Sequence, residues 1–237
     1  MDQSVIIADN KNDISLRSAA IITGIALIFM ALLAPVANFS ILQKLFIPGD
    51  AQATMSNILN SPGSFRAATV LFLIVAVLDI IVAWGLYVLF KPVNHSLSLL
   101  TAWIRVVYAT MLGVVITSLV YVIQITGGGG PAEFQDTGTF EVVIMQSLMK
   151  FNYGWEFSLI IFGFHLLLLG FLAYKAGYMK RILGILLLIA ALGYLIDGFG
   201  RILTVDYGKG IGVYTFLGEI VLIFWLLIAG GRDKATN

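Results

Sequence analysis

RAATVLFLIVAVLDIIVAWGLYVLF, residues 66–90, decides the fold, because Asp79 is its only charged side chain after Arg66. As a helix, with a rise of about 1.5 Å per residue, this stretch measures about 37 Å. The hydrocarbon core of a bilayer is about 30 Å thick. The stretch has no polar face that could meet water, so we predict a transmembrane helix.

Five further apolar runs of similar length occur at 16–39, 97–125, 152–174, 180–203 and 211–230. Only 11% of the 237 residues are charged and 59% are hydrophobic, whereas soluble domains carry about 25% charged residues. The runs lack the strict alternation of a membrane β-barrel. The first run is too long for a cleaved signal peptide. We therefore predict an all-α integral membrane protein, a bundle of about six transmembrane helices.

Lysine and arginine residues near the ends of the runs predict the orientation. Eight of them fall on one side: Lys11, Arg17, Lys91, Lys175, Lys180, Arg181, Arg232 and Lys234. Five fall on the other side, beside several acids: Lys44, Arg66, Lys150, Arg201 and Lys209. We expect both termini in the cytoplasm, with 1–15 as a flexible N-terminus, 16–231 as one transmembrane domain and 232–237 as a tail.

The longer outer loops contain signals for short surface helices. Asp50 follows Pro48-Gly49 and is typical of a helix N-cap, and the helix should end near Ser61-Pro62-Gly63. After a glycine-rich linker at 127–130, residues 139–150 also read as helical. A helix continuing to Lys175 would exceed the bilayer, so we expect a bend at 152–154. Several aromatic residues fit an interfacial belt: Tyr153, Trp155, Tyr194, Tyr207 and Tyr214.

Composition excludes several classes of function. A net charge of +1 offers no basic surface for nucleic acid. The chain has no cysteine and only two histidines, which argues against cysteine or multi-histidine metal sites and bis-histidine haem. No serine-hydrolase elbow, metalloprotease pair or nucleotide-binding loop occurs. We predict no catalytic residue, metal or cofactor, and an enzyme is the less favoured class.

Three ionisable residues should share one depth in three predicted helices. Asp79 lies about 18 Å from Lys91, and Arg105 and His165 lie about 15 Å from the same boundary. A charge at mid-bilayer costs roughly 2.5–17 kcal/mol, so Asp79 and Arg105 should pair, through a fork-shaped contact. The pair either clamps two helices or forms part of a binding or proton-transfer site with His165.

A second charged layer lies further out. Glu219, Asp197 and Glu156 are three acids, and Arg201, one turn after Asp197, is the base near them. If the acids converge on Arg201, the surplus negative charge would attract a proton or cation. The alternative is that these residues are solvated near the interface or act as clamps. Glu219 has no base on its own helix, so it must find Arg201, a neutralising proton or water.

Several motifs in order resemble the domain-of-unknown-function 4386 family of bacterial membrane proteins. They are Ile47-Pro48-Gly49-Asp50, the segment from Asp79 through Lys91-Pro92-Val93-Asn94 to Arg105, Phe162-Gly163-Phe164-His165-Leu166-Leu167-Leu168-Leu169-Gly170, Arg181-Ile182-Leu183-Gly184, Gly193-Tyr194-Leu195-Ile196-Asp197 and Gly218-Glu219. The resemblance implies a multi-pass protein of a bacterial inner membrane, and it implies no reaction, ligand or catalytic residue.

Three hypotheses of function follow. The first is binding or transport of a small solute or proton through the buried charged layers, with Asp79, Arg105, His165, Glu219 and the Asp197–Arg201 pair around a polar cavity. The second is a non-catalytic subunit or scaffold, with a homo-oligomer or membrane-complex partner, in which the charges are clamps. The third is a lipid-modifying enzyme. In each case the bilayer is the surrounding partner.

Overall fold

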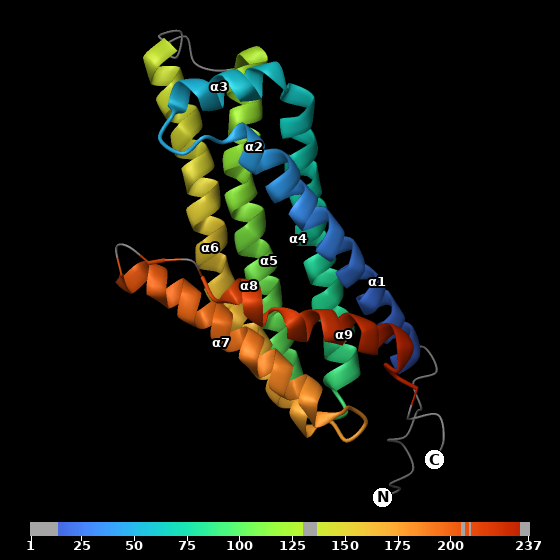
Figure 1. Ribbon diagram of the computed structural model, residues 1–237. Coiled ribbons are helices and arrows are strands. Elements are labelled where there is room, and N and C mark those ends of the chain that lie inside the picture. The colour runs from blue at the N-terminus through green and yellow to red at the C-terminus, as the bar shows by residue number, and fades with distance from the viewer. Residues whose placement is uncertain (1–13, 130–136, 205–206, 209, 233–237) are drawn as a thin grey trace, which may run out of the picture.

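The computed structural model describes residues 14–129, 137–204, 207–208 and 210–232, and every regular element among them is helical (Figure 1). The long helices are α1 (Leu16–Pro35), α4 (Pro62–Phe90), α5 (His95–Gln124), α6 (Thr137–Lys175) and α7 (Arg181–Leu203). The shorter ones are α2 (Gln43–Leu45), α3 (Ala51–Asn60), α8 (Gly212–Thr215) and α9 (Leu217–Ile228). Two π-helical stretches, η1 (Val36–Leu42) and η2 (Ile125–Gly129), extend α1 and α5. The predicted all-α class is confirmed.

Five helices in the described part of the chain are long and apolar enough to cross a membrane. The predicted sixth crossing at 211–230 is instead divided into α8 and α9. At about 1.5 Å per residue, the 12 residues of α9 measure about 18 Å, too short for a hydrocarbon core of about 30 Å. The break falls at Phe216. The start of α8 is fixed beside α7 by Asp197, whose carboxylate accepts the backbone N–H groups of Ile211 and Gly212.

The helices form a closed ring in the order α1, α4, α5, α6, α7 and α9, each packed against the next. Arg17 at the start of α1 closes the ring, because its guanidinium donates to the carbonyl oxygens of Leu226, Leu227 and Gly230 at the end of α9. The start of α1 and the end of α9 therefore lie at the same end of the bundle (Figure 1). That this end faces the cytoplasm stays a prediction. Lys11, Lys209 and Lys234, used in predicting the orientation, lie outside the described residues.

The short helix predicted to follow Asp50 is confirmed as α3, which lies across the end of the bundle opposite the start of α1 and packs on α6 (Figure 1). We call this the outer end, in line with the predicted orientation. Asp50 caps α3 by accepting the backbone N–H of Ala53 at 2.8 Å. The bend expected at 152–154 does not interrupt α6, which continues through it as one helix. A Cβ on Gly154 would collide with the side chain of Val115, so this glycine permits close packing on α5 rather than a bend.

Two apolar clusters fill the bundle. The cluster nearer α3, which we call the outer cluster, includes Phe72 and Ala76 of α4, with residues of α5, α6 and the η1 region. The inner one includes Val82 and Leu86 of α4, with residues of α1, α6, α7 and α9. On α4 the boundary between the clusters falls at Asp79, so a polar layer separates them.

Helices α6 and α7 approach most closely at two glycines. A Cβ on Gly184 would lie 2.5 Å from the backbone nitrogen of Tyr174 and 2.8 Å from the carbonyl oxygen of Gly170. Backbone atoms cannot move aside as a flexible side chain can. The contact therefore depends on the absence of a side chain at Gly184.

We predict that Gly184→Ala separates α6 from α7 and lowers the free energy of unfolding by about 1–3 kcal/mol, the usual cost of overpacking. Denaturation of the purified protein in detergent measures the loss. Gly113→Ala is the matched control, because a Cβ there meets nothing within 4 Å. Equal stability of Gly184→Ala and the control would contradict the packing described.

Candidate functional site

The inner charged layer consists of Asp79 on α4, Arg105 on α5 and His165 on α6. The exposed fractions are 0% for Asp79, 3% for Arg105 and 0% for His165, so the three side chains are shut off from lipid. Arg105 Nη2 donates to Asp79 Oδ1 at 2.6 Å. The predicted pairing of Asp79 with Arg105 is confirmed, and His165 joins it.

The predicted fork-shaped contact is wrong, because Arg105 divides its terminal nitrogens between two partners. Its Nη1 lies 3.1 Å from His165 Nε2. On the other side of the ring, His165 Nδ1 lies 2.9 Å from the carbonyl oxygen of Thr101, which accepts only. The proton of His165 therefore sits on Nδ1, and Nε2 accepts from Arg105. Among the described residues, Asp79 Oδ2 and Arg105 Nε make no hydrogen bond.

Phe162 connects this layer to a second polar group. The Arg105 guanidinium lies 5.2 Å from the centre of the Phe162 ring, a cation–π contact. The same ring packs edge-on against Tyr194 of α7, with the ring centres 5.3 Å apart. Tyr194 donates its hydroxyl to Glu219 Oε1 at 3.0 Å. A continuous path of contacts thus runs from Asp79 to Glu219.

Glu219 lies in the first turn of α9 and keeps part of its surface exposed. Its hydrogen bond comes from Tyr194, and neither of the two ion pairs among the described residues includes it. The predicted convergence of three acids on Arg201 is therefore wrong for Glu219. The sequence suggested an interfacial aromatic belt for Tyr194. In the structure its hydroxyl instead donates to Glu219.

Asp197 also does not reach Arg201. Its Oδ1 accepts from the Ile211 N–H at 2.8 Å and from the Tyr207 hydroxyl at 2.9 Å, and its Oδ2 accepts from the Gly212 N–H at 2.7 Å. The bond to Asp197 raises the pKa of Tyr207 above its ordinary value. Because all three bonds join Asp197 to residues that follow α7, its side chain holds the connection between α7 and α8 in place.

Arg201 pairs with Glu156, so one of the three predicted acids does meet it. The two side chains are 42% and 40% exposed. Exposed pairs contribute about 0–1 kcal/mol. The Glu156–Arg201 pair therefore matches the alternative in which these residues are solvated near the interface. Its two charges cancel, so the pair adds no surplus negative charge. The described residues contain no group of three His, Cys, Asp or Glu side chains placed to hold a metal ion.

Tyr194 and Phe162 are the site residues that the charge-based argument missed. Both stand in motifs that carry the family resemblance, next to Gly193 and Gly163. The glycines let α6 and α7 approach closely, since Gly163 lies against Leu195 and Tyr194. Aromatic residues beside such glycines are the signal in the sequence that points to them.

Membrane-length helices around a buried ion pair define a polytopic α-helical membrane protein. The family model described as "Domain of unknown function (DUF4386)" matches residues 22–230, and the chain belongs to this family. A protein of Archaeoglobus fulgidus described as "Uncharacterized protein" is similar, with 36% identity over 175 residues, which cover 74% of this chain and 90% of that protein. No solved structure matches. The predicted family is confirmed, while a bacterial source and an inner membrane stay predictions.

We predict that Arg105→Met or Asp79→Leu alone destabilises the protein by about 3–5 kcal/mol, because each leaves a buried charge without its partner. The double variant should be more stable than either single variant, since both charges are then gone. Denaturation of the three variants in detergent forms a double-mutant cycle. A double variant that loses the sum of the single effects would contradict the pairing.

Proposed function

We propose that the protein binds or transports a proton or a small cationic solute within the membrane, with Glu219 as the binding carboxylate. The observation that carries the proposal is the state of Glu219. It is an acid within the apolar bundle whose partner is a tyrosine hydroxyl rather than a base. Asp79, by contrast, is neutralised by Arg105.

A charge is costly in an apolar medium, and Glu219 must be accommodated there. An ionised side chain inside a membrane costs at least about 2.5 kcal/mol unless a base or a cation pairs with it or a water-filled cavity solvates it, and a bound proton removes the charge altogether. The two ion pairs of the described residues use Asp79 and Glu156, so a base does not neutralise Glu219 there. A proton or a bound cation supplies what the carboxylate requires.

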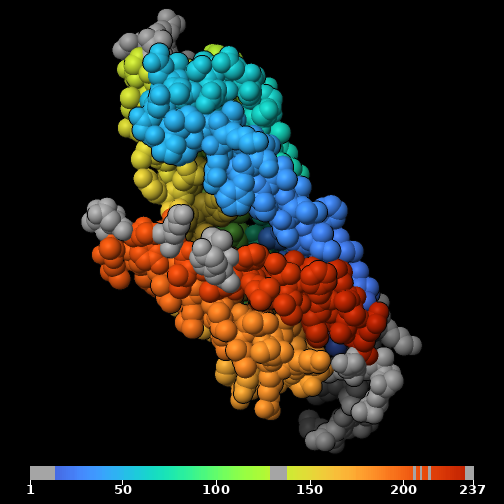
Figure 2. Space-filling model, viewed as in Figure 1, coloured from blue at the N-terminus to red at the C-terminus, as the bar shows by residue number. Residues whose placement is uncertain are grey.

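The short helix α9 supports access to this carboxylate. It packs on both α7 and α1 and runs across the long helices rather than along them, so it does not cover the full length of the gap between α1 and α7 (Figure 1). Figure 2 shows the surface hollowed between α1, α6 and α9, with deeper helices at the floor. Glu219, in the first turn of α9, keeps part of its surface exposed.

The inner layer has a positioning role in this proposal. Arg105 is held by Asp79 and His165, and its guanidinium packs on Phe162, which in turn packs on Tyr194. A shift of Arg105 therefore moves the ring that orients the Tyr194 hydroxyl toward Glu219. Binding at Glu219 and the packing of α4, α5 and α6 are linked through these contacts.

Proton flux into proteoliposomes tests the proposal. A pH gradient is imposed, and an entrapped pH-sensitive dye reports the flux with the purified chain. We expect Glu219→Gln to reduce the flux to that of protein-free liposomes, and the matched control Glu156→Gln to leave it unchanged, because that acid is exposed and paired with Arg201.

Competition by added monovalent cations distinguishes a proton from a solute cation as the bound species. Wild-type flux no greater than that of protein-free liposomes, with and without each added cation, would overturn the proposal. Flux that is equal in Glu219→Gln and wild type would overturn the role of Glu219.

One observation favours a second candidate, a non-catalytic scaffold. Arg105 bonds α4 through Asp79 and α6 through His165, so the charges join three helices in the manner of a clamp. A scaffold requires a partner, and chemical cross-linking in native membranes followed by purification would recover it in constant proportion. Flux that depends on Glu219, without such a partner, would contradict the scaffold.

A further inference from the structure

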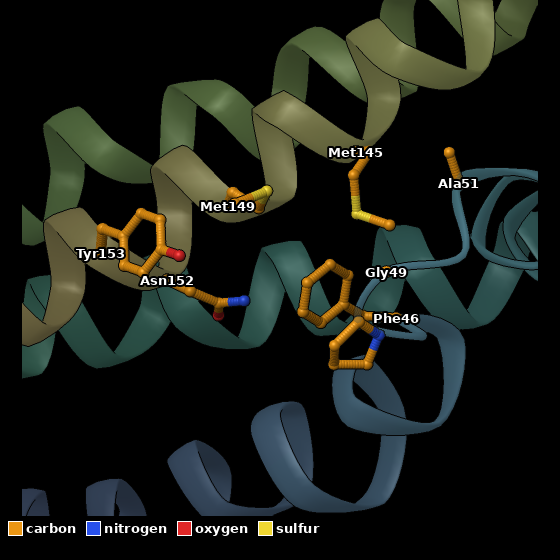
Figure 3. A pocket seen from close by; sticks show the side chains of 8 residues that line it. Phe46, Gly49, Ala51, Met145, Met149, Asn152 and Tyr153 are labelled. Atoms are coloured by element: carbon orange, nitrogen blue, oxygen red, sulfur yellow. The ribbon is translucent and has the colours of Figure 1, made fainter. Parts of the chain in front are cut away.

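A groove opens at the outer end of the bundle, far from the charged layers. One wall is the connection from α2 to α3, with Phe46, Pro48 and Gly49, and the other is α6, with Met145, Met149, Asn152 and Tyr153 (Figure 3). Its volume is about 350 Å³. Small-molecule sites have volumes of about 300–1,000 Å³, so the groove is large enough to hold a ligand.

Both walls are held by local structure. Residues 145, 149, 152 and 153 follow helical spacing and so share one face of α6. In the opposite wall, Gly49 turns the chain with a φ of 83°. The Thr54 hydroxyl accepts the N–H of Ile47 at 2.9 Å and donates to its carbonyl oxygen at 3.2 Å. The groove is therefore formed without a ligand.

Counting along α6 gives the depth of the groove. With Lys175 at the inner boundary, Tyr153 lies about 33 Å from it and Met145 about 45 Å, against a core of about 30 Å. On α4, Val70 is the outermost large apolar side chain that is exposed, about 30 Å from Phe90. Along α6 the groove thus begins about 33 Å from Lys175 and extends away from it, past the length needed to cross the hydrocarbon.

Outside the hydrocarbon, the apolar lining of the groove is exposed to water unless an apolar ligand covers it. Its lining is mostly apolar, with Phe46 and the flexible thioethers of Met145 and Met149. Figure 3 shows Asn152 and Tyr153 together at one end of the groove and Met145 at the other. A ligand with one polar end and one apolar chain matches this division.

The charges beside the groove select the sign of the polar end. Lys150 follows Met149 directly and Lys44 precedes Phe46 by two residues, and both are exposed. The acids nearest in sequence lie toward the Met145 end, where Glu141 is one turn before Met145 on α6 and the Asp50 carboxylate caps α3. Lys150 is thus nearer to Asn152 and Tyr153 than Glu141 is along α6.

We infer that this groove binds one single-chain anionic amphiphile of the fatty-acid class. Its carboxylate accepts from the Asn152 amide and the Tyr153 hydroxyl, with the positive charge of Lys150 next to this end of the groove, and its chain lies along Phe46, Met149 and Met145. At about 30 Å³ for each water-sized group, 350 Å³ holds about twelve groups, which is one chain and not two. The bound chain has left the hydrocarbon of the bilayer.

Photolabelling of the full chain in phosphatidylcholine nanodiscs tests the inference. The probe is a saturated fatty acid of about twelve carbons with a diazirine at the end of its chain. We expect the label on α6 near Met145, measured by peptide mass spectrometry. A quaternary ammonium probe of equal length is expected to give about tenfold less labelling there.

Two variants and a control make the test specific. Met149→Trp fills the groove and Lys150→Glu reverses the charge at its polar end, and each should weaken labelling near Met145 by about tenfold. Lys180→Glu, at the inner end of the bundle, should leave it unchanged. Labelling that is spread over the lipid-facing helices and unaffected by Met149→Trp would overturn the inference, as would equal labelling by the cationic probe. Competition by an anionic two-chain phospholipid mixed into the phosphatidylcholine nanodiscs, but not by unlabelled fatty acid, would overturn the single-chain assignment. None of these readouts depends on flux through Glu219.

Discussion

The bundle depends on how it accommodates one arginine in an apolar interior. Arg105 is nearly fully buried, and no water of the bulk solvent is available there to solvate its charge. It therefore requires acceptors from neighbouring helices, and it finds them in Asp79 of α4 and Nε2 of His165 on α6. Because an arginine cannot lose its charge in proteins, these three helices must stay together at this depth. One apolar cluster packs on each side of that layer.

A second constraint is the incomplete length of α9. Asp197 holds the start of α8 by two backbone N–H groups, so the chain re-enters the bundle part of the way along α7. Arg17 then holds the far end of α9 against α1. The ring of helices is closed, and its surface is hollowed on the face between α1, α6 and α9 (Figure 2). Glu219 lies in the first turn of α9, where its side chain is partly buried and partly exposed.

The sequence predicts the inner layer well because a helix has a fixed rise per residue. Counting from Lys91 and Lys175 placed Asp79 and His165 at one depth, and the cost of isolated charges then required Arg105 to pair. The outer layer could not be predicted in this way. Asp197 binds backbone N–H groups of a loop, and loop geometry leaves no periodic signal in the sequence. For the same reason the division between α8 and α9 was missed, since Glu219 is the only charged residue among residues 211–230. Whether a tyrosine lies at the interface or inside also depends on packing, as Tyr194 illustrates.

The protonation state of His165 reports whether Arg105 is held as the structure shows. The chain has only two histidines, so His95→Gln leaves His165 as the sole source of imidazole signals. Nitrogen-15 chemical shifts of the histidine-labelled protein at neutral pH distinguish the two ring nitrogens. The account predicts a proton on Nδ1, donated to the Thr101 carbonyl, and an unprotonated Nε2 that accepts from Arg105. A proton on Nε2, or the averaged signals of a freely exchanging imidazole, would contradict it.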